Sequence, residues 1–156
     1  MNSKWLMRGA IILLPLIFLF IFIRIPVIQL ETEDGVYYLT DEKFTITWVH
    51  SVEKEPWYEV YERKEDQLIL TETYFKTFGA GVPSNGDVHQ KNDGFVHMEV
   101  NRTMEALNLV VSENVQTTMI TEDEDIELYK MVEPYTEVRF SIEKLYLWNL
   151  FGGEFL

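Results

Sequence analysis

The chain has 156 residues, a formal net charge of −13 and no cysteine, which excludes a disulfide framework and any thiolate metal site. The charge is divided sharply along the chain: the first 30 residues carry three basic residues and no acid, whereas the rest carry 10 basic and 26 acidic residues, a net charge of 10 − 26 = −16. A body this acidic repels the phosphate backbone, which excludes nucleic acid as a partner.

The chain begins with a strongly apolar segment that runs from Gly9 to Ile23. A helix needs about 20 apolar residues to cross the hydrocarbon core of a bilayer. Gly9 to Ile28 provide that length if the Arg24 guanidinium extends to the lipid headgroups; the alternative span is Trp5 to Ile23, with Trp5 at the interface. Either span predicts one transmembrane helix.

The charges around this segment predict its orientation. Lys4 and Arg8 precede the apolar run, and basic residues stay on the cytoplasmic side. We therefore predict that residues 1–30 are an anchor of the signal-anchor type with the N-terminus in the cytoplasm. It would contact the lipid bilayer through residues 5–28, and residues 31–156 would form one domain outside the membrane.

The alternative is a secretory signal peptide, because such peptides also combine a basic start with an apolar core. The exit from the segment, Arg24 to Leu30, lacks the small-x-small pattern of a cleavage site. We therefore expect the anchor to remain uncleaved. Both alternatives place the body of the protein outside the cytoplasm.

The body shows short runs of alternating apolar and polar residues and no helical spacing. Phe44 to Val49 is the clearest run, because Phe44, Ile46 and Trp48 share one face of a strand. Turn-forming residues separate the runs, and there is no room for the crossover helices of a parallel α/β fold. We predict an all-β fold, an antiparallel β-sandwich or barrel-like domain. The predicted strands are 36–40, 44–52, 57–63, 68–78, 95–100, 107–111, 115–121, 126–132 and 138–147.

The densest group of polar and aromatic side chains runs from His50 to Tyr61. It predicts a β-hairpin with the four-residue loop Glu53 to Pro56, which would place His50 directly opposite Glu59. An imidazole beside a carboxylate suits ligand binding, catalysis or a metal, although a purely structural pair is the simplest interpretation. Ser51 would point to the other face of the strand, so it would not form a nucleophile–base pair with His50.

The second unusual segment is Phe78-Gly-Ala-Gly-Val-Pro83. Glycine permits positive φ and close approach of the backbone, so the segment predicts a tight loop leaving a strand. The alternative is a binding rim formed together with the His50 hairpin. The spacing matches neither a phosphate-binding loop nor a dinucleotide fingerprint, and we predict no cofactor.

Other residues give weaker indications. His89 and His97 would reach a common metal only through a fold that spacing does not reveal, and the acidic run Glu122 to Asp125 lacks the order of an EF-hand loop, so we predict no metal site. The C-terminal tail, Leu145 to Leu156, is rich in aromatic residues. We expect it to complete the core; contact with a membrane is the alternative.

The hairpin segment His50-Ser-Val-Glu-Lys-Glu-Pro56, the Glu59-Val-Tyr61 step and the 78–83 loop together resemble an uncharacterised bacterial family of exported proteins, a domain of unknown function. Members of that family are often encoded beside tripartite (TRAP) transporters of the TAXI type. The resemblance implies a protein of the bacterial cell membrane that assists solute uptake, with the transporter's membrane subunit or its solute receptor as partner. The family has no established activity that the resemblance could carry over to this chain.

Three functions remain open at this stage. The first is a non-catalytic accessory module that binds a partner or a solute. The alternatives are a hydrolase or metal-dependent enzyme that uses His50 and Glu59, and a purely structural envelope protein. The candidate binding residues are His50, Ser51, Glu59, Tyr61, Phe78, Gly79, Gly81 and Pro83.

Overall fold

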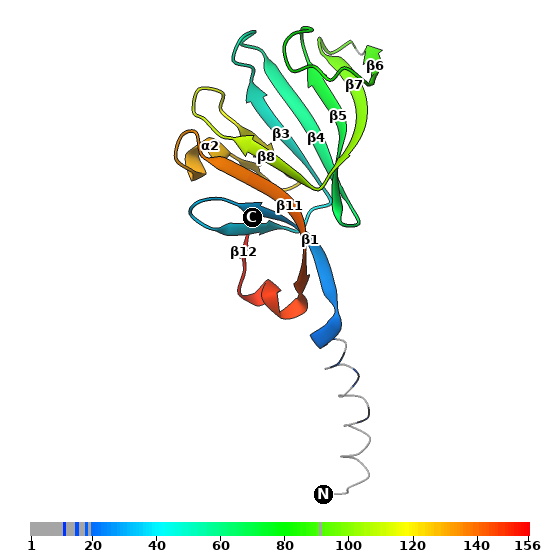
Figure 1. The fold of residues 1–156 in the computed structure, drawn as a ribbon, viewed down its shortest axis with the longest axis vertical. Helices are drawn as coiled ribbons and strands as arrows, with labels where there is room; N and C mark the ends of the chain where they lie inside the picture. The colour runs from blue at the N-terminus through cyan, green and yellow to red at the C-terminus, as the bar shows by residue number, and fades with distance from the viewer. Residues whose placement is uncertain (1–10, 12–14, 16–17, 19, 91) are drawn as a thin grey trace, which may run out of the picture.

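The structure is a computed structural model that describes residues 20–90 and 92–156, together with Ile11, Pro15 and Phe18 (Figure 1). Most of the predicted anchor lies outside the described residues, so the transmembrane span stays a prediction. Within the described part of the chain, no helix combines the length and the apolar character needed to cross a bilayer.

Strands make up most of the described chain, which confirms the prediction of an all-β fold. The strands are β1 (Arg24–Glu31), β2 (Val36–Leu39), β3 (Lys43–Val49), β4 (Pro56–Lys64), β5 (Gln67–Phe75), β6 (Asp87–Gln90), β7 (Val96–Met104), β8 (Ala106–Val110), β9 (Thr118–Ile120), β10 (Asp125–Ile126), β11 (Glu137–Tyr146) and β12 (Glu154–Phe155). Two short helices follow later strands, α2 (Leu128–Met131) and the 3-10 helix η1 (Leu147–Phe151).

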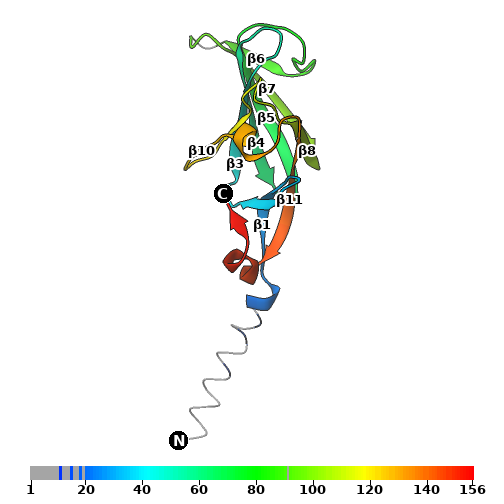
Figure 2. The same cartoon turned by 90° about the vertical axis from the view of Figure 1, so that its left-hand side faces the viewer.

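The strands form two sheets, and all pairs are antiparallel except β12 with β2. One sheet has the order β12-β2-β1-β11-β8, and the other has the order β10-β9-β3-β4-β5-β7-β6. The chain passes from the larger sheet to the smaller one twice, between β7 and β8 at Glu105 and again between β10 and β11. Figures 1 and 2 show the smaller sheet close to the start of β1 and the larger sheet extending away from it.

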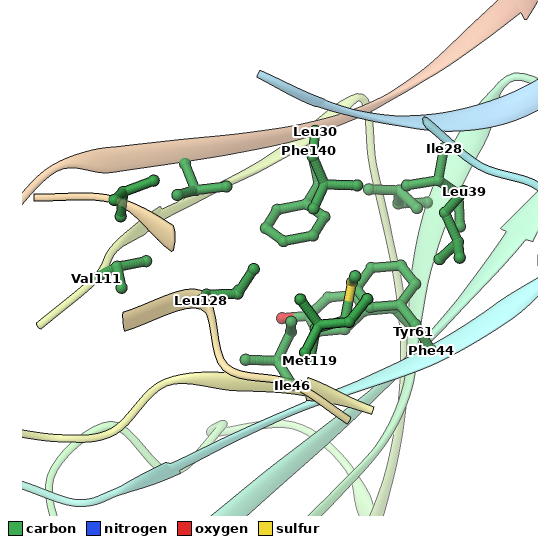
Figure 3. Packing of buried hydrophobic residues seen from close by; sticks show 14 of the residues in the cluster. Ile28, Leu30, Leu39, Phe44, Ile46, Tyr61, Val111, Met119, Leu128 and Phe140 are labelled. Atoms are coloured by element: carbon green, nitrogen blue, oxygen red, sulfur yellow. The ribbon is translucent and has the colours of Figure 1, made fainter. Parts of the chain in front are cut away.

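The core lies between the inner faces of the two sheets (Figure 3). Phe140 of β11 is fully buried, and its ring stacks on Phe44 of β3 at 5.4 Å; Phe44 stacks in turn on Tyr61 of β4 at 5.3 Å. Phe44 and Ile46 are both buried, as the alternation along β3 predicts. The apolar faces of the two sheets therefore cover each other.

The smaller sheet contains residues that the sequence analysis assigned to the anchor. β1 lies between β2 and β11, and its Val27, Ile28 and Leu30 are buried in the domain. The longer predicted span, Gly9 to Ile28, is therefore wrong for residues 24–28, and the domain begins at Arg24 rather than at residue 31. The physical reason is that β1 has buried side chains on both faces, since the adjacent residues Val27 and Ile28 are both buried, so its sequence is apolar without alternation like the segment before it.

Two further predictions need correction near the C-terminus. Residues 126–132 do not form one strand: after the two-residue β10 the chain turns into α2, and Leu128 at its start and Val132 just after its end both pack in the core. The tail completes the core only in part. Leu156 packs against the core cluster, whereas Phe151 of η1 has 85% of its surface exposed.

Candidate binding site

The hairpin of β3 and β4 exists, but its register differs from the predicted one. Trp48 lies opposite Trp57, and Ile46 lies opposite Glu59. The strand β3 ends at Val49, and His50 opens a turn in which its carbonyl accepts the Lys54 N–H at 3.0 Å. The predicted pairing of His50 with Glu59 is therefore wrong, because the loop begins earlier than the spacing suggested.

His50 is instead held by the loop that follows it and by the 78–83 loop. Its Nε2 lies 3.1 Å from the Ala80 carbonyl, and its Nδ1 contacts the Glu53 carboxylate. The ring also stacks on Trp57 with 5.4 Å between centroids. The backbone N–H groups of Val52 and Glu53 also point at Nδ1, which lies 3.4 and 3.5 Å from the two nitrogens, so the ring is held on both sides.

The hairpin loop and the 78–83 loop pack on each other, so the structure brings these two predicted segments together. A side chain at position 79 would overlap the Glu53 carboxylate, which explains why glycine fits there. Gly81 has a φ of +88°, a conformation that favours glycine. Phe78 packs edge-on against Phe75, with 5.1 Å between ring centroids. Pro83 lines a surface pocket of about 330 Å³ between this loop and β7.

We predict that His50→Ala releases the 78–83 loop without unfolding the domain. The substitution removes the contact with Ala80 and the stacking on Trp57, a loss of about 0.5–1.5 kcal/mol. Limited proteolysis with chymotrypsin should cut after Phe78 several-fold faster than in the parent chain. His89→Ala is the matched control, because His89 is exposed on β6. Equal cleavage of both variants would contradict this role for His50.

Glu59 forms a different pair from the predicted one. Its carboxylate accepts a hydrogen bond from the Tyr61 hydroxyl, two residues along β4. Burial raises the pKa of Glu59, against the opposing effects of the Tyr61 hydrogen bond and the positive charge of Arg102. Burial, followed by the charge of Glu59 and the hydrogen bond to it, raises the pKa of Tyr61. The two side chains therefore form a polar pair on the otherwise apolar inner face of the larger sheet, where Glu59 lies opposite Ile46.

A cleft of about 270 Å³ opens between the two sheets beside this face. Ile46 and Trp48 of β3 form one wall, and Leu109 and Val110 of β8, the edge strand of the smaller sheet, form the other. The remaining lining residues are His50, Ser51, Val115 and Thr117. The cleft thus has apolar walls with an imidazole and a hydroxyl at one side.

Ser51 reaches the same cleft as His50 because the chain has left the strand at that point. The ring nitrogens of His50 face Ala80 and Glu53 rather than the Ser51 hydroxyl. Glu59 lies opposite Ile46 on the neighbouring strand, so it is close to the cleft wall without lining the cleft. The arrangement suits binding of an apolar group with one polar contact.

The sequence did not predict the wall of the cleft that β8 and the segment after it contribute. The alternation in 107–111 predicts the strand, but spacing gives no information on which strand of the other sheet faces it. Within residues 20–90 and 92–156, no group of three or more His, Asp or Glu side chains is arranged to hold a metal ion. His97 pairs with Asp93 at 2.6 Å instead.

Comparison with known proteins places this site within a family. No curated protein and no solved structure matches the chain. A family described as "Domain of unknown function (DUF1850)" matches residues 44–128, more than half of the 156 residues. The matched stretch runs from β3 to the start of α2 and contains the hairpin, the 78–83 loop and both walls of the cleft. The chain therefore belongs to the DUF1850 family, which confirms the resemblance to a domain of unknown function.

Proposed function

We propose that the protein is a membrane-tethered, non-catalytic binding module whose site is the cleft between the two sheets. In this proposal a β-sandwich stands outside the bacterial cell membrane behind one transmembrane helix, whose N-terminus is cytoplasmic. The apolar segment and the basic residues Lys4 and Arg8 that precede it support this placement.

The observation that carries the binding role is the cleft itself. Its apolar walls, Ile46, Trp48 and Leu109, provide a surface from which a ligand can exclude water, and His50 and Ser51 provide polar contacts at the rim. A volume of about 270 Å³ suits a small apolar solute or one or two apolar side chains of a partner protein. The resemblance to proteins encoded beside TAXI-type TRAP transporters suggests the transporter's membrane subunit or its solute receptor.

The contacts of His50 favour binding over catalysis. A hydrolase needs a base within reach of a nucleophile and an orienting group. His50 is fixed by Ala80 and Glu53, and Glu59 is bonded to Tyr61. The predicted dyad of the enzymatic alternative is therefore not assembled, and we place His50 and Ser51 in the binding rim.

We expect a photo-crosslinking residue at Val110, in the cleft wall, to capture the partner in intact membranes. Val88 on β6 is the matched control, because both are exposed valines and Val88 lies in the other sheet, away from the cleft. Adducts from Val110 that are absent from Val88 and that contain the transporter subunit or receptor would support the proposal. Equal adducts from both positions, together with unchanged solute uptake after deletion of the protein, would overturn it.

A further inference from the structure

We propose that the end of the domain nearest the N-terminal helix lies against the lipid bilayer through an aromatic surface, the base surface, formed by Phe20, Phe22, Tyr146, Trp148 and Phe151 with Arg24. This inference rests on the membrane tether of the proposed function. It adds the orientation of the domain and the residues that contact lipid.

The base surface is built where the first and last parts of the domain meet. Arg24 at the start of β1 lies opposite Tyr146 at the end of β11. The Arg24 guanidinium lies 4.4 Å from the centre of the Tyr146 ring and donates a hydrogen bond to the Tyr146 hydroxyl. Trp148 stacks on the same tyrosine with 4.3 Å between centroids. These stacked groups hold η1 in a fixed position.

The helical residues 20–22, just before β1, lie beside this stack. Phe20 lies 6.3 Å from Trp148, centroid to centroid. Figures 1 and 2 both show η1 next to the point where the helix joins β1. The base surface is therefore continuous with the apolar segment that is proposed to enter the membrane.

The exposure of these side chains indicates that something other than water covers them. Phe151 is 85% exposed and Phe22 is 62% exposed, and Trp148 also lies at the surface. Clustered exposed aromatic residues are uncommon on a soluble surface. Tryptophan and tyrosine, with an arginine beside them, are the residues enriched where proteins meet the headgroup region of a bilayer.

The charge distribution favours lipid over an ordinary aqueous surface. The body carries a net charge of −16, yet Glu154 is the only charged side chain between Leu145 and Leu156. The guanidinium of Arg24 is held over the Tyr146 ring and has further N–H donors, which are placed to meet lipid phosphates. A bilayer is therefore the occupant that matches both the aromatic and the charged groups of the base surface.

One consequence concerns the candidate site. The loop between β3 and β4 and the loop between β5 and β6 lie at the opposite end of the domain from the helix (Figure 1). With the base surface on lipid, the rim that contains His50 faces away from the bilayer. It is then accessible to a soluble receptor.

The absence of cysteine allows a direct test with the full chain in vesicles of phosphatidylethanolamine and phosphatidylglycerol. An environment-sensitive dye would be attached to the variant Phe151→Cys. The matched control is the variant Phe78→Cys, because Phe78 is also an exposed phenylalanine but lies in the 78–83 loop at the other end of the domain. We expect the dye at position 151 to shift to the blue and to be quenched by lipids with a quencher in their chains, with neither effect at position 78. Circular dichroism checks that both variants fold.

The outcomes separate the base surface from the tether. If the chain stays with the vesicles but both dyes report water, the base surface is not a lipid contact while the tether stands. If the dye at position 151 is shielded from water but lipid quenchers do not reach it, a second protein copy covers the surface and the inference is wrong. If the chain does not stay with the vesicles, the tether and the base surface both fail.

Discussion

A chain that begins at Arg24 should fold cooperatively, whereas one that begins at Glu31 should not. The two chains differ by β1, which carries Val27, Ile28 and Leu30 in the core and lies between β2 and β11. Burial of one such side chain contributes about 1.5–3 kcal/mol, so the three contribute roughly 5–9 kcal/mol. A domain of this size has a total stability of about 5–15 kcal/mol, so the loss removes most of it.

Urea unfolding followed by tryptophan fluorescence distinguishes the two chains. The longer chain should show one cooperative transition, and the shorter one a gradual change without a folded baseline. The variant Ile25→Ala in the longer chain is a useful control, because Ile25 belongs to the same strand but is only half-buried. A cooperative transition in the chain that begins at residue 31 would restore the domain boundary that the sequence suggested.

This boundary shows where alternation in a sequence stops being informative. Strands with one buried face, such as β3 and β11, alternate in polarity, so they are predicted as strands, and the extent of β11 is within one residue of the predicted one at each end. In β1 the neighbouring residues Val27 and Ile28 are both buried. Its pattern therefore merges with the apolar segment before it, and hydropathy alone cannot separate a strand in a sheet from the end of a membrane span.

The candidate site was predictable as a region but not as a geometry. The sequence places the polar residues of the hairpin near the 78–83 loop only as an alternative, and the contact of His50 with Ala80 shows that the two segments meet. The register depended on where β3 ends, which is decided by the turn from His50 to Lys54. The partner of Trp48 moves from Tyr61 to Trp57, an even number of residues, so each side chain keeps its predicted face.

The cleft shows a second feature of the structure that the sequence does not predict, the packing of one sheet against the other. Its walls come from β3 and from β8, which lie in different sheets and are separated in the chain by residues 50–105. Local spacing determines which residues of one strand share a face. It does not determine which strand of the other sheet covers that face, because that choice depends on packing of the whole core.

The pair formed by Glu59 and Tyr61 predicts a pH dependence of opposite sign to that of a paired surface carboxylate. Because the pKa of Glu59 is raised in the folded state, the folded protein binds more protons than the unfolded one between the two pKa values. The contribution of Glu59 to stability is therefore most favourable below the unfolded pKa and falls as the pH rises through the folded pKa. A tenfold difference in proton affinity corresponds to about 1.4 kcal/mol.

Glu59→Gln should remove this fall, because an amide keeps the shape of the side chain and stays neutral at every pH. The free energy of unfolding is measured by urea denaturation across the acidic to neutral range. The value for the variant minus the value for the parent should increase as the pH rises. Above the folded pKa the difference should become constant. A difference in free energy of unfolding between variant and parent that is the same at every pH would show that Glu59 does not titrate with a raised pKa.

Tyr61→Phe tests the other half of the pair. It removes the hydrogen bond from a buried hydroxyl to a partly buried carboxylate, so we expect a loss of about 1.5–3 kcal/mol at neutral pH. The loss should shrink in acid, where Glu59 is protonated and a neutral hydrogen bond is about half as strong. Tyr74→Phe is the matched control, because Tyr74 donates to Glu72 in the same arrangement on β5 while both residues stay partly exposed to solvent. A similar loss in both variants would mean that burial adds nothing to the inner pair, whereas a larger and pH-dependent loss at Tyr61 identifies Glu59 as the titrating group beside the cleft.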